Sequence, residues 1–302
     1  MDALRRIGTA LAVMWLALTL AFVVLRGVPG DTVDATLARN GATAAERAAE
    51  REALGLNDPL WQQYARYVRG LVRGDWGCSL INGQPVGDIL TQNLGATLTL
   101  TLAALLIAVP GGVLLGVMAA IAPWPVLRLL AEGAISLALA TPIYWTATLA
   151  IYLLTIEWPV LPGLGATGPR AVVLPALVLG FHTAGSIAPV AASHVRAAQR
   201  QDFVRTAHAK GLPPADVLDH VLRVGLLPVI AVIGLQLGFL LSGTVITEAI
   251  FLRRGLGRVL LDAITNRDYP VVQGVVLLAA LGYSMANALA DLLTRQLDPR
   301  LT

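Results

Sequence analysis

The stretch LTLTLAALLIAVPGGVLLGVMAAIA occupies residues 98–122 and holds no charged side chain. A helix needs about 20 consecutive, mostly apolar residues to cross the hydrocarbon core of a bilayer. At a rise of about 1.5 Å per residue, this stretch is long enough for one crossing. It therefore predicts a membrane-spanning helix.

Five more apolar runs accompany it along the chain, near residues 7–25, 129–156, 172–195, 224–251 and 271–293. The composition agrees with a lipid environment, since 56% of the 302 residues are hydrophobic and 14% are charged. A soluble domain carries about 25% charged residues. We expect an all-α integral membrane protein with six transmembrane helices.

The first apolar run, 7–25, has two interpretations because Arg5 and Arg6 precede it. It exceeds the length of about 7–15 residues of a signal-peptide core, and no small-x-small cleavage site clearly follows. We predict a retained anchor helix over residues 1–29. An outer segment over 30–95 and a domain with five spans over 96–302 then follow.

The basic residues predict the orientation, since short cytoplasmic loops are enriched in Lys and Arg. If both termini are inside, ten basic residues fall in the inner segments and five in the short outer loops. The sequence therefore predicts that both termini are cytoplasmic.

The outer segment is polar and contains two helix signals. Thr43 and Glu46 have the spacing of a capping box, and Gly55 suits the end of the helix that they open. Residues 57–59 (Asn-Asp-Pro) predict a second helix, which carries Trp61 and two tyrosines at helical spacing. We expect a small helical cap, in which Trp61 and neighbouring aromatics pack a small core. The cap either docks a partner protein or shields the helix ends.

The segment between the fourth and fifth spans, about 196–228, is predicted to face the cytoplasm. Residues 201–210 predict a short helix, and Gly211 suits a left-handed residue that ends it. Pro213 and Pro214 favour a second short helix with an apolar face. Such a ledge could receive force from a soluble motor or rest on lipid headgroups, and the pattern alone slightly favours the latter.

The residues of this ledge carry a family resemblance. Residues 201–212, QDFVRTAHAKGL, followed by 226–228, LLP, resemble the EAA loop of ABC importer permeases, in the form found in dipeptide, oligopeptide and nickel permeases. Four further stretches are similar to the same family in order and spacing: RGDWG at 73–77, GLGR at 255–258, NRDYPVVQG at 266–274 and LDPR at 297–300. The long first loop resembles the first of the two membrane subunits that such importers contain.

The resemblance implies a type I ABC importer fold with a cytoplasmic coupling helix, in a bacterial inner membrane. It also implies the partners: a second homologous permease subunit, two cytoplasmic ATPase subunits, and a periplasmic or lipid-anchored substrate-binding protein. By this resemblance the ATPase-coupling residues are Asp202, Phe203, Arg205, Thr206, Ala207, Lys210, Gly211, Leu212 and Pro228. The candidate docking residues for the binding protein are Trp61, Tyr64, Arg73, Asp75 and Trp76.

Several positions depart from the family pattern. Residues 213–216 (Pro-Pro-Ala-Asp) and Asp219 replace a stretch that is usually more basic. Arg205 stands where the general EAA pattern has glutamate, as is common in this subfamily. Phe203 and His208 stand where the subfamily often has tyrosine and arginine. Because they lie on the surface expected to touch the ATPase, they would affect which ATPase is accepted rather than the fold.

No catalytic or metal site is expected in this chain. A Walker A sequence needs Gly-Lys followed by Ser or Thr, and the chain's one lysine, Lys210, precedes Gly211. ATP and Mg²⁺ are therefore expected in partner subunits, with no cofactor bound here. Cys78 stands alone, and the net charge of +3 without basic clusters gives no reason to expect nucleic acid.

Two other classes of membrane protein are alternatives to the permease. A transporter driven by an ion gradient would use ionisable groups within spans. Glu132, Glu248 and Asp291 are instead expected near span ends, where water is close, and His182 and His194 do not share a helix face. A membrane enzyme would need clustered catalytic groups, which the sequence lacks. The substrate stays open between peptides, glutathione-like compounds and nickel or metal chelates.

Overall fold

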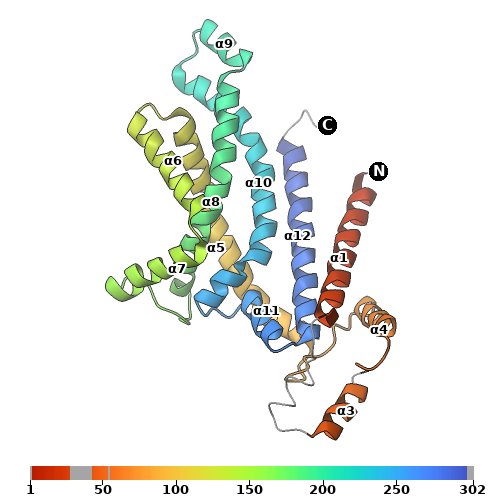
Figure 1. Ribbon diagram of the computed structural model, residues 1–302. Coiled ribbons are helices and arrows are strands. Elements are labelled where there is room, and N and C mark those ends of the chain that lie inside the picture. The colour runs from red at the N-terminus through yellow and green to blue at the C-terminus, as the bar shows by residue number, and fades with distance from the viewer. Residues whose placement is uncertain (1, 28–42, 54, 298–302) are drawn as a thin grey trace. The chain divides into compact units, whose positions relative to one another are not determined.

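The computed structural model describes residues 2–27, 43–53 and 55–297 (Figure 1). Helices make up nearly all of this part of the chain, which confirms the all-α prediction. They are α1 (Asp2–Gly27), α3 (Ala44–Ala53), α4 (Leu60–Val72), α5 (Val86–Ile121), α6 (Pro125–Ala140), α7 (Ile143–Ile151), the π-helical turn η1 (Tyr152–Glu157), α8 (Arg170–Gln199), α9 (Asp202–Ala209), α10 (Pro214–Ile250), α11 (Leu256–Thr265) and α12 (Tyr269–Leu297).

Five helices of the described chain are long and apolar enough to cross a membrane: α1, α5, α8, α10 and α12. The predicted run 129–156 differs from these, because α6 and the α7–η1 segment meet at 106°. The break falls at Thr141 and Pro142, both in extended conformation. A proline disfavours helical dihedrals in the residue before it. The described chain therefore has five spans, or six if the bent pair is one.

Other prolines leave their helices intact. Pro110 lies inside α5, Pro175 and Pro189 inside α8, and Pro228 inside α10. The predicted separate second helix of the ledge does not exist, because α10 continues from Pro214 into the span without a break. No residue of α10 takes a positive φ that would end it.

The described chain divides into two compact units. Unit 1 comprises residues 1–97 and 254–282 and contains α1, α3, α4, α11 and the first turns of α5 and α12. Its apolar cluster joins Val86 and Leu90 of α5 to Leu256 of α11 and Val272 of α12. The Thr97 hydroxyl accepts a hydrogen bond from the Leu256 N–H at 2.9 Å and so binds the start of α11 to α5.

Unit 2 comprises residues 98–253 and 283–302, with α8 as its most buried helix. Apolar clusters join α8 to α5, α6, α7 and α10. The approach of α5 to α8 depends on small residues: a Cβ added at Gly116 would lie 2.5 Å from the Ala188 carbonyl oxygen. Small residues permit such close helix contacts in membranes.

Candidate functional site

The helix α9 is a short element with a sharp end. Gln201 is extended (φ −79°, ψ 155°) and precedes it, and Asp202 places a carboxylate in its first turn. Gly211 has φ +73° and donates its N–H to the His208 carbonyl at 3.0 Å. The Leu212 N–H reaches the Ala207 carbonyl at 3.1 Å, which completes a Schellman-type end. The predicted helix and its left-handed glycine are both confirmed.

Apolar contacts seat α9 on its neighbours in unit 2. Val204 and Ala207 are each 9% exposed and join a cluster with Val195 of α8 and Val217 and Val221 of α10. Figure 1 shows α9 beyond the end of α8, with the start of α10 beside it. The Ala207 side chain packs inward against this cluster.

The opposite face of α9 is exposed. Asp202, Arg205, Thr206 and Lys210 lie on it, while Phe203 and Leu212 are half-buried against the cluster. Arg205 and Asp202 are 3.9 Å apart, but the two side chains are 86% and 96% exposed. An ion pair in water contributes little, so both side chains remain available to a partner. Pro228 does not join this face, since it lies inside α10.

Arg196 links the C-terminal end of α8 to α5 and α6, close to α9. Its guanidinium donates to the Ala119 carbonyl of α5 at 2.8 Å and to Glu132 of α6 at 3.1 Å. Three helices of unit 2 are therefore tied together by one side chain near α9. Such bracing holds the seat of α9 in a fixed geometry.

The other ionisable candidates within unit 2 have structural surroundings. His182 contacts the Thr146 hydroxyl at 2.6 Å and the Ala138 carbonyl at 2.8 Å, across the α6–α7 break. Glu248 is fully buried in α10, so the expectation that water lies close to it is wrong for this unit.

In unit 1, the cap begins with a capping box, as predicted. The Glu46 carboxylate accepts the Thr43 N–H at 2.7 Å, and the Thr43 hydroxyl accepts the Glu46 N–H at 3.3 Å. The bonds from Thr43 lower the pKa of Glu46 from its ordinary value. Gly55, with φ +62°, follows α3 as expected.

Helix α4 packs on α1 through tyrosines. Tyr64 and Tyr67 lie against the Phe22 ring at centroid distances of 5.2 and 6.2 Å, and the Tyr64 and Thr19 hydroxyls are 2.7 Å apart. Trp61 is 69% exposed. The prediction that Trp61 packs a small core of the cap is therefore wrong, because α4 turns its tyrosines inward instead.

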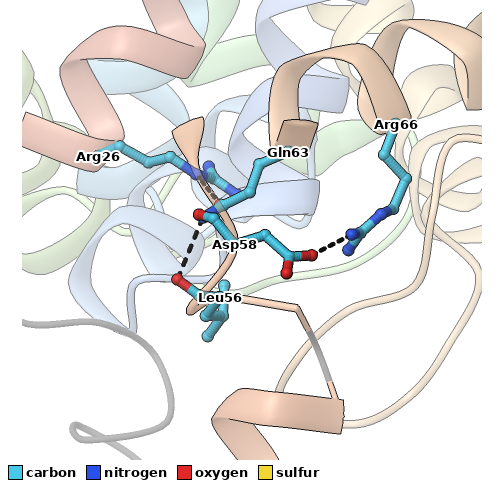
Figure 2. A network of polar contacts seen from close by, with 5 residues as sticks. All are labelled: Arg26, Leu56, Asp58, Gln63 and Arg66. Atoms are coloured by element: carbon cyan, nitrogen blue, oxygen red, sulfur yellow. Dashed lines mark hydrogen bonds and ion pairs between the residues drawn. The ribbon is translucent and has the colours of Figure 1, made fainter. Parts of the chain in front are cut away.

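Gln63 organises the seat of α4 (Figure 2). Its amide oxygen accepts from Arg26 Nε at 2.6 Å, and its amide nitrogen donates to the Leu56 and Asp58 carbonyls at 3.1 and 2.8 Å. The Asp58 carboxylate pairs with Arg66. The Asn57 and Asp58 side chains make no capping bond at α4; Asp58 serves this network instead.

The five docking candidates do not gather on one face. Trp61, Arg73 and Asp75 are exposed, whereas Tyr64 packs on α1 and Trp76 packs on the apolar cluster of unit 1. The exposed members are available to a partner, and the half-buried Tyr64 and Trp76 support the fold.

Two stretches that the sequence presents separately meet in unit 1. The Asp268 carboxylate accepts the Ser79 hydroxyl and, at 3.1 Å, the Leu80 N–H. A Cβ added at Gly77 would lie 3.7 Å from Pro270. The RGDWG and NRDYPVVQG stretches therefore form one substructure. The sequence analysis assigned no role to Asp268. The signal that could have identified it is its position in the NRDYPVVQG stretch.

Comparison with known proteins identifies the family. The profile for the binding-protein-dependent transport system inner membrane component matches residues 112–302, and the profile for the N-terminal part of such membrane components matches residues 3–101. The chain belongs to this family of binding-protein-dependent transport permeases. It is a multi-pass inner-membrane permease subunit of an ABC importer, a system that also contains ATPase and substrate-binding subunits.

Characterised relatives of this permease match over nearly its whole length. The dipeptide transport system permease protein DppB of Escherichia coli (strain K12) is 34% identical, covering 99% of this chain and 97% of the relative. The di/tripeptide transport system permease protein DppB of Pseudomonas aeruginosa is 36% identical, with coverage of 98% and 97%. The glutathione transport system permease protein GsiC of Escherichia coli (strain K12) is 33% identical, with coverage of 99% and 97%.

A solved structure supports the fold of the permease. The crystal structure of an amino acid ABC transporter with histidines superposes with a TM-score of 0.55 over 70% of this chain and 94% of that one. At 18% sequence identity this likeness concerns the fold alone. It agrees with the predicted type I importer architecture.

Proposed function

We propose that this permease imports peptides of two or three residues, as one of two homologous subunits that line a shared translocation path. The proposal draws its substrate from the relatives, whose names specify dipeptides, di/tripeptides and glutathione. The second subunit would supply the other half of the path.

In this proposal α9 is the coupling helix, and it faces the cytoplasm together with both termini. The observation that carries the assignment is the combination of a buried seat and a free charged face. Val204 and Ala207 fix α9 to α8 and α10, while Asp202, Arg205 and Thr206 are exposed. A helix held in this way can pass a partner's movement to the spans behind it.

ATP and Mg²⁺ are proposed to bind the partner ATPase subunits and not this chain. Lys210 supports this assignment, because it follows the end of α9. A phosphate-binding loop instead places its lysine at the start of a helix, where N–H groups point at the anion. Energy for import would then reach this chain only through contacts such as those of α9.

On the opposite face, the cap is proposed to receive the substrate-binding protein through its exposed residues Trp61, Arg73 and Asp75. Deleting residues 43–72 should abolish delivery of substrate while the ATPase subunits stay attached. Unchanged uptake by the deleted complex would show that the cap only shields the helix ends.

Reconstituted uptake tests the proposed function as a whole. The complete importer in proteoliposomes should accumulate a labelled dipeptide when the ATPase subunits and ATP are present, and should not do so when either is omitted. Glutathione and Ni²⁺ serve as alternative substrates in the same vesicles. Uptake driven by an imposed ion gradient without ATP would contradict the proposal.

A further inference from the structure

Unit 1 contains a cavity of about 250 Å³ between the end of α1, α4 and the first turn of α12. Arg26, Tyr67, Trp76 and Gln273 are among its lining residues. One water molecule takes about 30 Å³ of liquid volume. The cavity is therefore larger than a single bridging water requires.

Arg26 is held in this cavity without a carboxylate partner. Its Nε donates to Gln63, and its guanidinium carbon lies 4.3 Å from the centre of the Phe22 ring and 5.6 Å from that of Tyr269. Figure 2 shows the Arg26 side chain ending at the Gln63 amide. These contacts fix the guanidinium, yet its buried Nη1 has no hydrogen-bond acceptor in the part of the chain that the structure describes.

Two more residues of the lining carry buried donors. Tyr67 Oη and Gln273 Nε2 also lack partners among residues 2–27, 43–53 and 55–297, and Gln273 is only 5% exposed. Burial raises the pKa of Tyr67, so its phenol keeps its proton and can donate. Buried donors without acceptors are rare and costly in native proteins. Three around one cavity point to a ligand that accepts hydrogen bonds.

The charge of the lining specifies the ligand further. Arg66 is neutralised by Asp58, and the exposed Asp75 already accepts the Gly77 N–H at 2.8 Å. Arg26 is thus a half-buried positive charge that forms no ion pair with the carboxylate of Asp75 or with any other residue of the described lining. A carboxylate supplies one negative charge and two acceptor oxygens, and hydrogen bonds to such charged groups are strong.

We propose that this cavity of unit 1 is a binding site for one carboxylate group. The group comes either from a small free carboxylate or from an acidic side chain of a protein docked on the cap. The site itself does not depend on the proposed transport function, since it is argued only from the donors and charges of unit 1.

Two tyrosines allow a matched test in the intact importer complex in nanodiscs. Saturation-transfer NMR with acetate, at constant ionic strength set by chloride, measures binding of the free carboxylate. Tyr67→Phe removes one donor and should weaken acetate binding about tenfold. Tyr64→Phe should leave it unchanged, because the Tyr64 hydroxyl contacts Thr19 and does not line the cavity. Arg26→Gln should abolish binding, and Gln273→Leu provides a second test if Arg26→Gln fails to assemble.

The association of the substrate-binding protein with the same variants distinguishes the two sources. If acetate does not bind, but Tyr67→Phe weakens that association and Tyr64→Phe does not, the carboxylate belongs to the protein partner. If neither assay separates Tyr67→Phe from Tyr64→Phe, the carboxylate site is wrong. ATP-driven dipeptide uptake by the wild-type complex tests the proposed transport function independently of the carboxylate site.

Discussion

The α9 ledge and the α3–α4 cap are both short helical segments outside the long apolar helices. Apolar contacts hold the first in place, and polar contacts hold the second. In unit 2, α9 sits on an apolar cluster and exposes charged side chains. In unit 1, α4 is bound to α1 by the Tyr64 hydroxyl, a glutamine amide and a guanidinium, beside the cavity that Arg26 lines. Close apolar packing transmits displacement, whereas a polar seat with unfilled donors suits reversible binding.

The largest expected difference comes from introducing the same backbone strain after α9 and after α4. Gly211 (φ +73°) and Gly74 (φ +81°) both have positive φ and open space at the Cβ position. Valine at either costs on the order of 1–3 kcal/mol through backbone strain alone. Gly211→Val should fray α9 and abolish coupled transport, while Gly74→Val should leave ATPase binding intact.

Co-purification of the ATPase subunits with each variant measures this difference. Insertion of both variants should be normal, because no lipid-facing residue changes. If Gly211→Val binds and transports like wild type, α9 does not have the coupling role that its geometry suggests.

A smaller effect should follow from overfilling the seat of α9. Ala207→Leu adds volume at a buried position and should cost about 1–3 kcal/mol, lifting α9 from its cluster. Ala209→Leu makes the same change at an exposed position and should stay within about 0.5 kcal/mol. Hydrogen-exchange protection of α9 compares the two variants, and equal protection would show that the apolar seat does not hold α9 in place.

The smallest effect concerns α3, which its own capping box stabilises. Thr43→Ala should lower local helix stability by about 0.5–1 kcal/mol. Because the Thr43 bonds lower the pKa of Glu46 in the folded state, this carboxylate stabilises α3 above its unfolded-state pKa. That contribution is lost as the pH falls through the lower folded-state pKa.

Hydrogen-exchange protection of α3, corrected for the intrinsic pH dependence of exchange, follows this loss. Protection should fall in acid for the wild type, and Glu46→Gln should remove the dependence. A wild-type profile as flat as that of Glu46→Gln would mean that the capping box contributes nothing in solution.

Local signals made much of this fold predictable. The apolar runs give α1, α5, α8, α10 and α12 because span length and hydrophobicity are properties of consecutive residues. The capping box at Thr43 and the left-handed Gly211 are likewise local, since each depends on bonds within four or five residues.

The incorrect or missing predictions concern features that depend on contacts between residues far apart in the sequence. Pro142 follows the end of a helix, while Pro110 and Pro228 lie inside helices, so the presence of a proline does not by itself predict the break. The aromatic spacing of α4 did not reveal which face turns inward, so Trp61 was misplaced. The proposed carboxylate site could not be predicted from the sequence, because Arg26, Tyr67 and Gln273 come from three separate helices.

Photo-crosslinking from position 205 tests the central claim most directly. A photoreactive residue in place of Arg205 sits on the exposed face of α9, and the same residue in place of the exposed Trp61 serves as the comparison in the cap. In the assembled importer, position 205 should crosslink to an ATPase subunit and position 61 should not. A crosslink from position 205 to the substrate-binding protein, or an ATPase crosslink from position 61 alone, would contradict the account.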